Sequence, residues 1–268
     1  MTPAIAAGIF ACLCYGFAAF LLVRSLKTNT PLNRPFLLGV AALGLAAHAY
    51  NLNAALFRPD GIEFGLINVI SLFGFVLAAC GTLITLFRDI QSLLAPAYPA
   101  ACIGVLLNLF MHDRVGPHIE LSGGMVAHIL LSVVAYSVIA LALSQALLLS
   151  IQNYQLKHRH IHDILNLLPP LQTMENTLFD LISIGLLLLT AAIGSGLLFV
   201  EDFFAQHLLH KTVFALGAWL VLWMMIVGRH LWGWRGMVAV RWTLAGFLLL
   251  TLAYFGSKFV LEVVLQRV

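Results

Sequence analysis

Residues 126–151 read VAHILLSVVAYSVIALALSQALLLSI, a stretch that contains no Asp, Glu, Lys or Arg. A helix of about 20 residues crosses the ~30 Å hydrocarbon core of a bilayer. Apolar residues fill successive positions, whereas a membrane-barrel strand would alternate apolar and polar ones. The stretch therefore predicts a transmembrane helix with one ionisable side chain, His128, near its start.

The rest of the chain has the same character. Of its 268 residues, 62% are hydrophobic and 9% are charged, and the mean hydropathy is +0.99. A soluble domain carries roughly 25% charged residues. This composition excludes an ordinary soluble protein, a disordered chain and a nucleic-acid binder. A net charge of +3 is too small to indicate a partner.

The apolar runs predict an all-α fold, a polytopic membrane helix bundle of about eight transmembrane helices. We expect one integral membrane domain over residues 1–268, with no separable soluble domain. We also expect a short interfacial helix before Pro169 and Pro170, on the inner connection. The runs lie near 3–23, 36–56, 66–87, 93–111, 126–151, 178–200, 212–230 and 242–264.

The basic residues of the connections predict the orientation, because inner loops are enriched in Lys and Arg. With the N-terminus outside, nine Lys and Arg residues fall on the inner side and five on the outer side. We therefore expect both termini outside. The first run has no basic segment before it, so we interpret it as a retained span rather than a cleaved signal peptide.

His48 lies well inside a predicted span, and His128, His210 and His230 stand at span ends. His48 is within the second run, and an ionisable residue there is a functional-site candidate. His128 opens the fifth run and His210 precedes the seventh, both on the expected outer face. Two neutral imidazoles from different helices can bind haem iron from its two sides, while Phe-, Leu- and Trp-rich spans provide an apolar slot. No CxxCH motif for covalent haem is present, so the pattern favours a non-covalent b-type haem.

The polar residues also allow two other interpretations, a metal site and a serine protease. His207 and His210, at i and i+3, could hold Zn²⁺ or another divalent ion, with Glu201 and Asp202 as the nearby carboxylates. The Gly194-Ser195-Gly196 stretch would suit an intramembrane serine protease only if Ser195 contacted a histidine. Small residues in a span are more often packing contacts. The four cysteines form no CxxC and are expected to be small core residues.

Several motifs resemble the cytochrome c assembly proteins, a family that includes the CcmC, CcmF and CcsA types and the smaller YpjD/HemX-type proteins. The first is Leu168-Pro-Pro-Leu-Gln-Thr-Met-Glu175, and the most specific is His230 followed by Gly233-Trp-Arg-Gly236. The resemblance covers nearly the whole chain and is strongest over 120–260. The remaining elements are Asn68 with Ser71, His128 with Ser132 and Ala135-Tyr136, Phe179, Gly185, Leu189-Thr190, Ile193, Ser195-Gly196, and Tyr254-Phe-Gly256.

The resemblance implies haem contact at particular residues. His128 matches the first of the family's two external histidines, and His230 matches an intramembrane haem-ligating histidine of the CcsA type. The second external histidine would fall near Leu265, where this chain has none. The family's Trp-rich external motif is also missing from residues 200–212. These departures are similar to those of the YpjD/HemX-type subgroup, and they argue against full haem lyase activity.

Together these observations predict a multi-pass protein of the bacterial inner membrane that binds or passes haem. We expect an accessory of cytochrome or haem biogenesis rather than an enzyme with a catalytic residue of its own. Its expected partners are membrane lipid, haem and other biogenesis membrane proteins, but no nucleic acid. The candidate haem ligands are His128, His210, His48 and His230. A role in divalent-cation homeostasis and a purely structural role in a membrane complex remain the alternatives.

Overall fold

A computed structural model describes residues 2–28, 30, 32–58, 61–88, 90–111, 122–158, 169–199 and 206–256. For residues 26, 27, 58, 206–210, 255 and 256 it describes the backbone alone. The helical prediction is confirmed, because eight helices among these described residues are long and apolar enough to cross a membrane.

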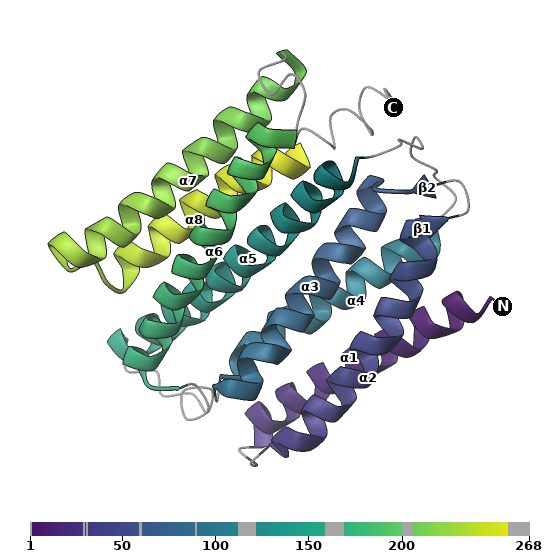
Figure 1. Cartoon of the computed structure of the whole chain (residues 1–268). Helices are drawn as coiled ribbons and strands as arrows, with labels where there is room; N and C mark the ends of the chain where they lie inside the picture. The colour runs from purple at the N-terminus through teal and green to yellow at the C-terminus, as the bar shows by residue number, and fades with distance from the viewer. Residues whose placement is uncertain are drawn as a thin grey trace. The chain divides into compact units, whose positions relative to one another are not determined.

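Within each of the two units defined below, successive helices run in opposite directions (Figure 1). Their bounds are α1 Pro3–Thr28, α2 Arg34–Leu56, α3 Leu66–Phe87, α4 Leu94–Met111, α5 Gly123–Lys157, α6 Leu171–Phe199, α7 Gln206–Trp232 and α8 Met237–Thr251. A 3-10 turn, η1 (Gln91–Leu93), precedes α4, and a π-helical turn, η3 (Leu252–Gly256), continues α8. Between α2 and α3, a two-residue ladder pairs β1 (Phe57–Arg58) with β2 (Gly61–Ile62).

The chain divides into two compact units. Unit 1 comprises residues 1–120 with 154–169, and therefore holds α1 to α4 and the last turn of α5. Unit 2 comprises residues 121–153 with 170–268, and holds the rest of α5 together with α6, α7 and α8.

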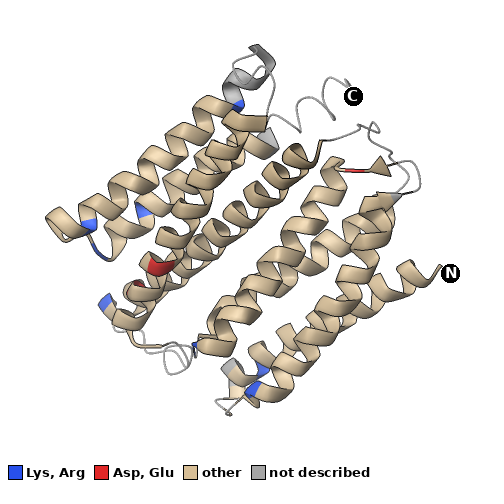
Figure 2. Cartoon of the chain, in the orientation of Figure 1, with Lys and Arg blue, Asp and Glu red and all other residues tan. Residues whose placement is uncertain are grey.

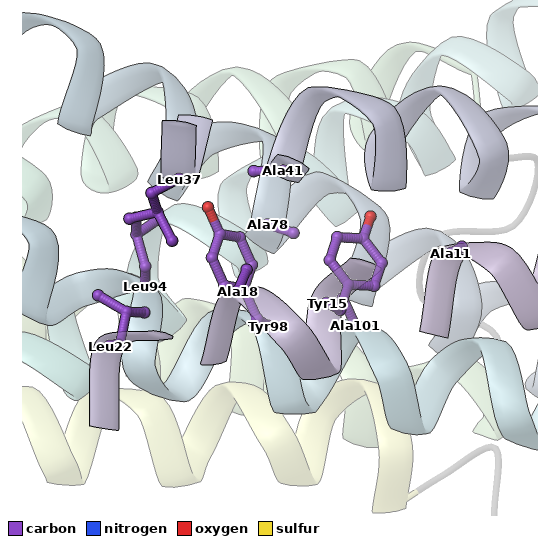
Figure 3. Packing of buried hydrophobic residues seen from close by; sticks show 10 residues of the cluster. All are labelled: Ala11, Tyr15, Ala18, Leu22, Leu37, Ala41, Ala78, Leu94, Tyr98 and Ala101. Atoms are coloured by element: carbon purple, nitrogen blue, oxygen red, sulfur yellow. The ribbon is translucent and has the colours of Figure 1, made fainter. Parts of the chain in front are cut away.

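The core of unit 1 is built around two tyrosines from α1 and α4. The rings of Tyr15 and Tyr98 are stacked, with centroids 5.7 Å apart and planes 22° apart. Both side chains are fully buried, and small or branched apolar residues surround them (Figure 3). Tyrosine is tolerated in such a core when its hydroxyl finds a partner. Tyr98 meets this condition through Thr82, whose hydroxyl lies 3.3 Å away.

Helices α3 and α4 approach each other closely because glycines face backbone atoms. A Cβ added at Gly74 would lie 3.0 Å from the Cα of Ala101, and one at Gly104 would lie 3.1 Å from the Cα of Ser71. Small residues permit such contacts where lipid supplies no hydrophobic drive between helices. Helices α3 and α4 pack closely even though Pro99 lies inside α4.

Helix boundaries differ from the predicted runs where polar residues extend a span. The sixth run was expected at 178–200, but α6 begins at Leu171. Pro169 and Pro170 precede its first turn. A missing N–H is tolerated there, because the first N–H groups of a helix have no acceptor within the helix. The polar segment 172–176 is helical and forms the first turns of α6. Helix α8 likewise begins at Met237 instead of 242, and the predicted interfacial helix at 161–168 lies outside the described residues.

Basic residues lie at particular helix ends (Figure 2). In unit 1, Arg24, Arg34 and Arg88 lie where α1 ends, α2 begins and α3 ends. In unit 2, three arginines lie around the connection between α7 and α8; they are Arg229, Arg235 and Arg241. This distribution agrees with the pattern from which we predicted the orientation, and the orientation itself stays a prediction.

Candidate functional site

His48 lies in the core of unit 1 and is fully buried. Its Nδ1 is 3.2 Å from the Tyr15 hydroxyl of α1, and its Nε2 is 3.1 Å from the Ser71 hydroxyl of α3. Phe75 closes one side, with its ring centroid 5.4 Å from that of the imidazole. His48, which belongs to α2, therefore links α1, α2 and α3 through hydrogen bonds at both of its ring nitrogens.

This arrangement limits what His48 can ligate. A neutral imidazole has one N–H and one lone pair, and the two hydroxyls can each donate or accept. Either tautomer satisfies both contacts, so neither nitrogen is left over. An iron ligand must offer a lone pair, and His48 would first have to give up one of these bonds.

His128 lies in the second turn of α5, against the last turns of α6 in unit 2. Its Nδ1 is 3.0 Å from the carbonyl oxygen of Ala192 and 3.0 Å from the Ser195 hydroxyl. The Ser195 hydroxyl itself donates to the same carbonyl, at 2.8 Å. The side chain is half-buried.

These contacts define the protonation of the ring. A carbonyl oxygen only accepts, so the bond to Ala192 requires the proton on Nδ1. The lone pair then belongs to Nε2. The Ser195 hydroxyl donates its hydrogen bond to the Ala192 carbonyl and accepts from the Nδ1–H of His128. In a nucleophile–base pair, the serine hydroxyl would instead donate to the histidine nitrogen. The Ser–His contact that a protease would need is present, but its hydrogen bonds point the other way.

The end of α6 beside His128 presents apolar side chains. Leu197, Leu198 and Phe199 are all exposed, Leu198 by 78%. The Phe199 ring lies over Gly124 at the start of α5, where an added Cβ would overlap the ring. An apolar rim therefore lies beside His128.

His230 lies in the last turn of α7. Its Nδ1 is 2.8 Å from the carbonyl oxygen of Ile226, one turn earlier, so by the same reasoning the lone pair belongs to Nε2. The side chain is exposed. Leu231 and Trp232, the next two residues, are 69% and 64% exposed. His230 thus lies among apolar and aromatic side chains at the end of its helix.

The Gly233–Gly236 turn folds back on the end of α7. Gly233 and Gly236 have φ of +66° and +53°, values that side chains other than glycine rarely adopt. The N–H of Trp234 donates to the carbonyl of Gly228, at 3.2 Å. The Trp234 ring stacks between those of Trp232 and Trp242, with centroid distances of 5.5 and 5.0 Å.

Two motifs of the resemblance, Leu168–Glu175 and Gly233–Gly236, are in contact at this turn. The carboxylate of Glu175, in the first turns of α6, accepts the N–H of Gly236 at 2.9 Å. Beside it, Asn176 accepts a hydrogen bond from the Arg229 guanidinium, at 3.2 Å. From the sequence, Glu175 was only part of a resembling motif, and Asn176 and Arg229 were not singled out. A carboxylate near the end of a span is a signal that could have found Glu175.

Other elements of the resemblance tie helices together. The Asn68 amide donates to the carbonyl of Glu63, at 3.1 Å, and its oxygen accepts from the Asn108 amide, at 2.7 Å. The Tyr136 and Thr251 hydroxyls lie 2.9 Å apart, and the Tyr136 ring stacks on Phe247. These polar residues connect helices within a unit.

The predicted metal ligands lie beyond what the structure describes. Glu201 and Asp202 are outside the described residues, as are the side chains of His207 and His210. Within the described part of the chain, no group of three His, Cys, Asp or Glu side chains is arranged to hold a metal ion.

Comparison with known proteins decides the family. The family model described as "Cytochrome C assembly protein" matches residues 36–265, which include most of both units. The chain belongs to this family. The resemblance drawn from its motifs is therefore confirmed for the family as a whole.

Two relatives of this family member show how far the similarity extends. The "Inner membrane protein YpjD" of Escherichia coli (strain K12) is 31% identical over 259 residues, which is 96% of this chain and 98% of the relative. The "Uncharacterized 28.8 kDa protein in nifR3-like 5'region" of Azospirillum brasilense is 31% identical over 140 residues, about half of each chain. No solved structure matches. With eight candidate spans, the chain is a multi-pass protein of the inner membrane.

Proposed function

We propose that this member of the cytochrome c assembly family binds haem non-covalently in unit 2, as an accessory in cytochrome or haem biogenesis. The observation that carries the proposal is the geometry of His128. Its Nδ1–H is held by the Ala192 carbonyl, at 3.0 Å, which leaves the Nε2 lone pair for a metal.

This is the arrangement that histidine ligands of metals commonly have. A backbone carbonyl that accepts the other ring N–H fixes the tautomer, orients the ring and raises the basicity of the ligating nitrogen. Bound haem would supply an iron with axial positions for imidazole nitrogen. The chain's part is to hold His128 in one tautomer and to offer an apolar surface to the ring.

The surroundings of His128 suit an apolar, planar ligand better than a bare ion. Leu197, Leu198 and Phe199 are exposed at the neighbouring end of α6. Such side chains can pack against a porphyrin ring, whereas a divalent ion needs oxygen, nitrogen or sulfur ligands.

His230 is the second ligand candidate in unit 2, with its Nδ1–H held by Ile226 in the same manner. His128 is near the start of α5 and His230 near the end of α7, two helices that run in the same direction (Figure 1). The two histidines therefore stand at opposite ends of the unit and cannot share one iron. Each would hold a separate haem, or a haem at a separate stage of transfer.

The remaining candidates take lesser places in this proposal. His48 would have to break a hydrogen bond to Tyr15 or Ser71 before binding iron. His210 remains a possible second axial ligand for the haem at His128, on the expected outer face.

The test is the absorption spectrum of the detergent-purified protein from a haem-replete host, before and after hemin titration. We expect a Soret band that weakens in His128→Ala and in His230→Ala. His158→Ala is the matched control, because His158 is exposed and its Nδ1 also contacts the carbonyl of the residue one turn earlier, Tyr154.

Two results would overturn the proposal. One is wild-type protein that is colourless and takes up no hemin. The other is a spectrum that neither His128→Ala nor His230→Ala changes beyond the His158→Ala control. Metal analysis of the same preparation tests the cation alternative, which predicts stoichiometric zinc or another divalent ion without a Soret band.

A further inference from the structure

Three consecutive residues at the start of α6 each bind a different part of unit 2. The carbonyl of Met174 accepts from the amide of Gln145 on α5, at 3.1 Å. The carboxylate of Glu175 accepts from Gly236, and the amide oxygen of Asn176 accepts from Arg229 on α7. This segment, Met174–Asn176, fixes the end of the unit at which His230 lies.

The contact of Glu175 completes a helix cap. Gly236 is the N-cap residue of α8, and no side chain of its own segment caps this helix. In a capping box, a Glu side chain accepts the N–H of the N-cap residue from three positions further along the same helix. Here the carboxylate comes from α6, 61 positions earlier in the chain.

Charge and burial make this contact a strong one. Glu175 is only 8% exposed, so its carboxylate has little water to bond with instead. A carboxylate accepting from a backbone N–H makes a charge-assisted bond, and the positive end of the α8 dipole adds to it. Losing the carboxylate would leave a buried N–H without an acceptor.

The cap controls the geometry of the turn that follows His230. The Gly233–Gly236 segment is closed at one end by the Trp234 bond to Gly228, and at the other by the Gly236 bond to Glu175. On α7, Arg229 is held by Asn176, and its guanidinium carbon lies 3.7 Å from the centroid of the Phe179 ring. His230 is the next residue, between these two attachments to α6.

We infer that Glu175 is a positioning residue for His230. Its carboxylate fixes the turn at Gly236 and thereby the orientation of the imidazole and of the tryptophans beside it. That a ligand is bound at His230 rests on the proposed haem function. That Glu175 holds the turn rests on the contacts alone, so the two claims are tested separately.

The experiment compares Glu175→Ala with Glu175→Gln in the full-length protein in lipid nanodiscs. Glutamine keeps an oxygen that can accept from Gly236, whereas alanine removes it. Glu63→Gln is the matched control, because Glu63 is the other buried glutamate among the described residues and lies in unit 1. Three measurements are made on each: amide exchange over residues 234–240, the near-ultraviolet circular dichroism of the stacked tryptophans, and hemin affinity in a His128→Ala background.

In Glu175→Ala we expect amide exchange over the turn to be about tenfold faster and hemin binding to be about tenfold weaker. Glu175→Gln should recover most of both, and Glu63→Gln should match the parent. If Glu175→Gln changed amide exchange and hemin affinity as much as Glu175→Ala, the loss would be purely structural and the positioning role would be overturned.

Unchanged amide exchange and tryptophan dichroism in Glu175→Ala would overturn the role in the turn. Faster exchange with unchanged hemin affinity and spectrum would overturn the positioning of His230. If the parent protein takes up no hemin at all, the proposed function fails, while exchange and dichroism still decide whether Glu175 holds the turn.

Discussion

At the scale of single residues, the three described candidate histidines fall into two kinds. His48 uses both ring nitrogens inside the core, whereas His128 and His230 each use Nδ1 for a backbone carbonyl and keep Nε2. From the sequence, all three were candidates on residue type and position, or on the resemblance. The partners of His48 and His128 lie on other helices, which no local pattern predicts, whereas His230 bonds to Ile226 of its own helix.

The first residue-scale prediction concerns Tyr15. In Tyr15→Phe, the ring that stacks on Tyr98 is kept but the hydroxyl that meets His48 is lost. A ring nitrogen in the membrane interior then has no partner, which should destabilise the protein by about 1 kcal/mol. Unfolding in detergent of increasing denaturing strength measures this. Tyr50→Phe, at an exposed position of α2, is the control, and equal stability of the two variants would contradict the prediction.

The second residue-scale prediction concerns Ser195. In Ser195→Ala, the Ala192 carbonyl still accepts the Nδ1–H of His128, so the tautomer is retained. Hemin affinity should fall by less than about threefold, with the absorption maxima unchanged, because only a secondary hydrogen bond is removed. A loss as large as that of His128→Ala would mean that Ser195, rather than the carbonyl, holds the ring.

At the scale of elements, the approach of the turn to α7 depends on glycine. A Cβ at Gly228 would overlap the Trp234 ring, whereas one at Gly217 on the same helix would lie at an ordinary 3.7 Å from Leu249. Gly228→Ala must therefore displace Trp234 from between its two stacked neighbours.

We expect Gly228→Ala to lower stability by about 1–3 kcal/mol despite the helix preference of alanine, since overpacking outweighs it. The tryptophan dichroism should weaken in the same variant. Gly217→Ala should be neutral or slightly stabilising. Thermal melts and near-ultraviolet spectra of both proteins provide the check, and matching melts would show that the turn moves freely.

The elements themselves were largely predictable from hydropathy, because long uncharged runs have one stable form in lipid. The start of α6 was not, since Gln172, Glu175 and Asn176 look like a loop by polarity. Their helical state follows from contacts with α5, α7 and the α7–α8 turn, which are distant in sequence. The meeting of Glu175 with Gly236 likewise needs the packing of α6 against the α7–α8 hairpin, and only the resemblance had placed both in significant motifs.

At the scale of the whole molecule, eight spans and the family membership agree with the sequence prediction, while the orientation awaits its own test. Ser122 precedes α5 and Lys157 ends it, and both are exposed. If both termini face outward, Ser122 is outside and Lys157 inside.

We therefore expect a membrane-impermeant maleimide to label Ser122→Cys in intact spheroplasts, and Lys157→Cys only after the membrane is opened. The background replaces the four native cysteines with serine or alanine. The positive-inside distribution is the physical reason for this expectation. Labelling of Lys157→Cys alone in intact spheroplasts would reverse the orientation.

The cap on α8 also bears on the order in which the protein is made. Its acceptor, Glu175, leaves the ribosome before its donor, Gly236, so the carboxylate is already in place when the α7–α8 hairpin enters the membrane. Until then, the N–H of Gly236 is not there to bond with Glu175. A chain truncated after α6 should therefore lack the capped end of unit 2, although α6 itself is complete.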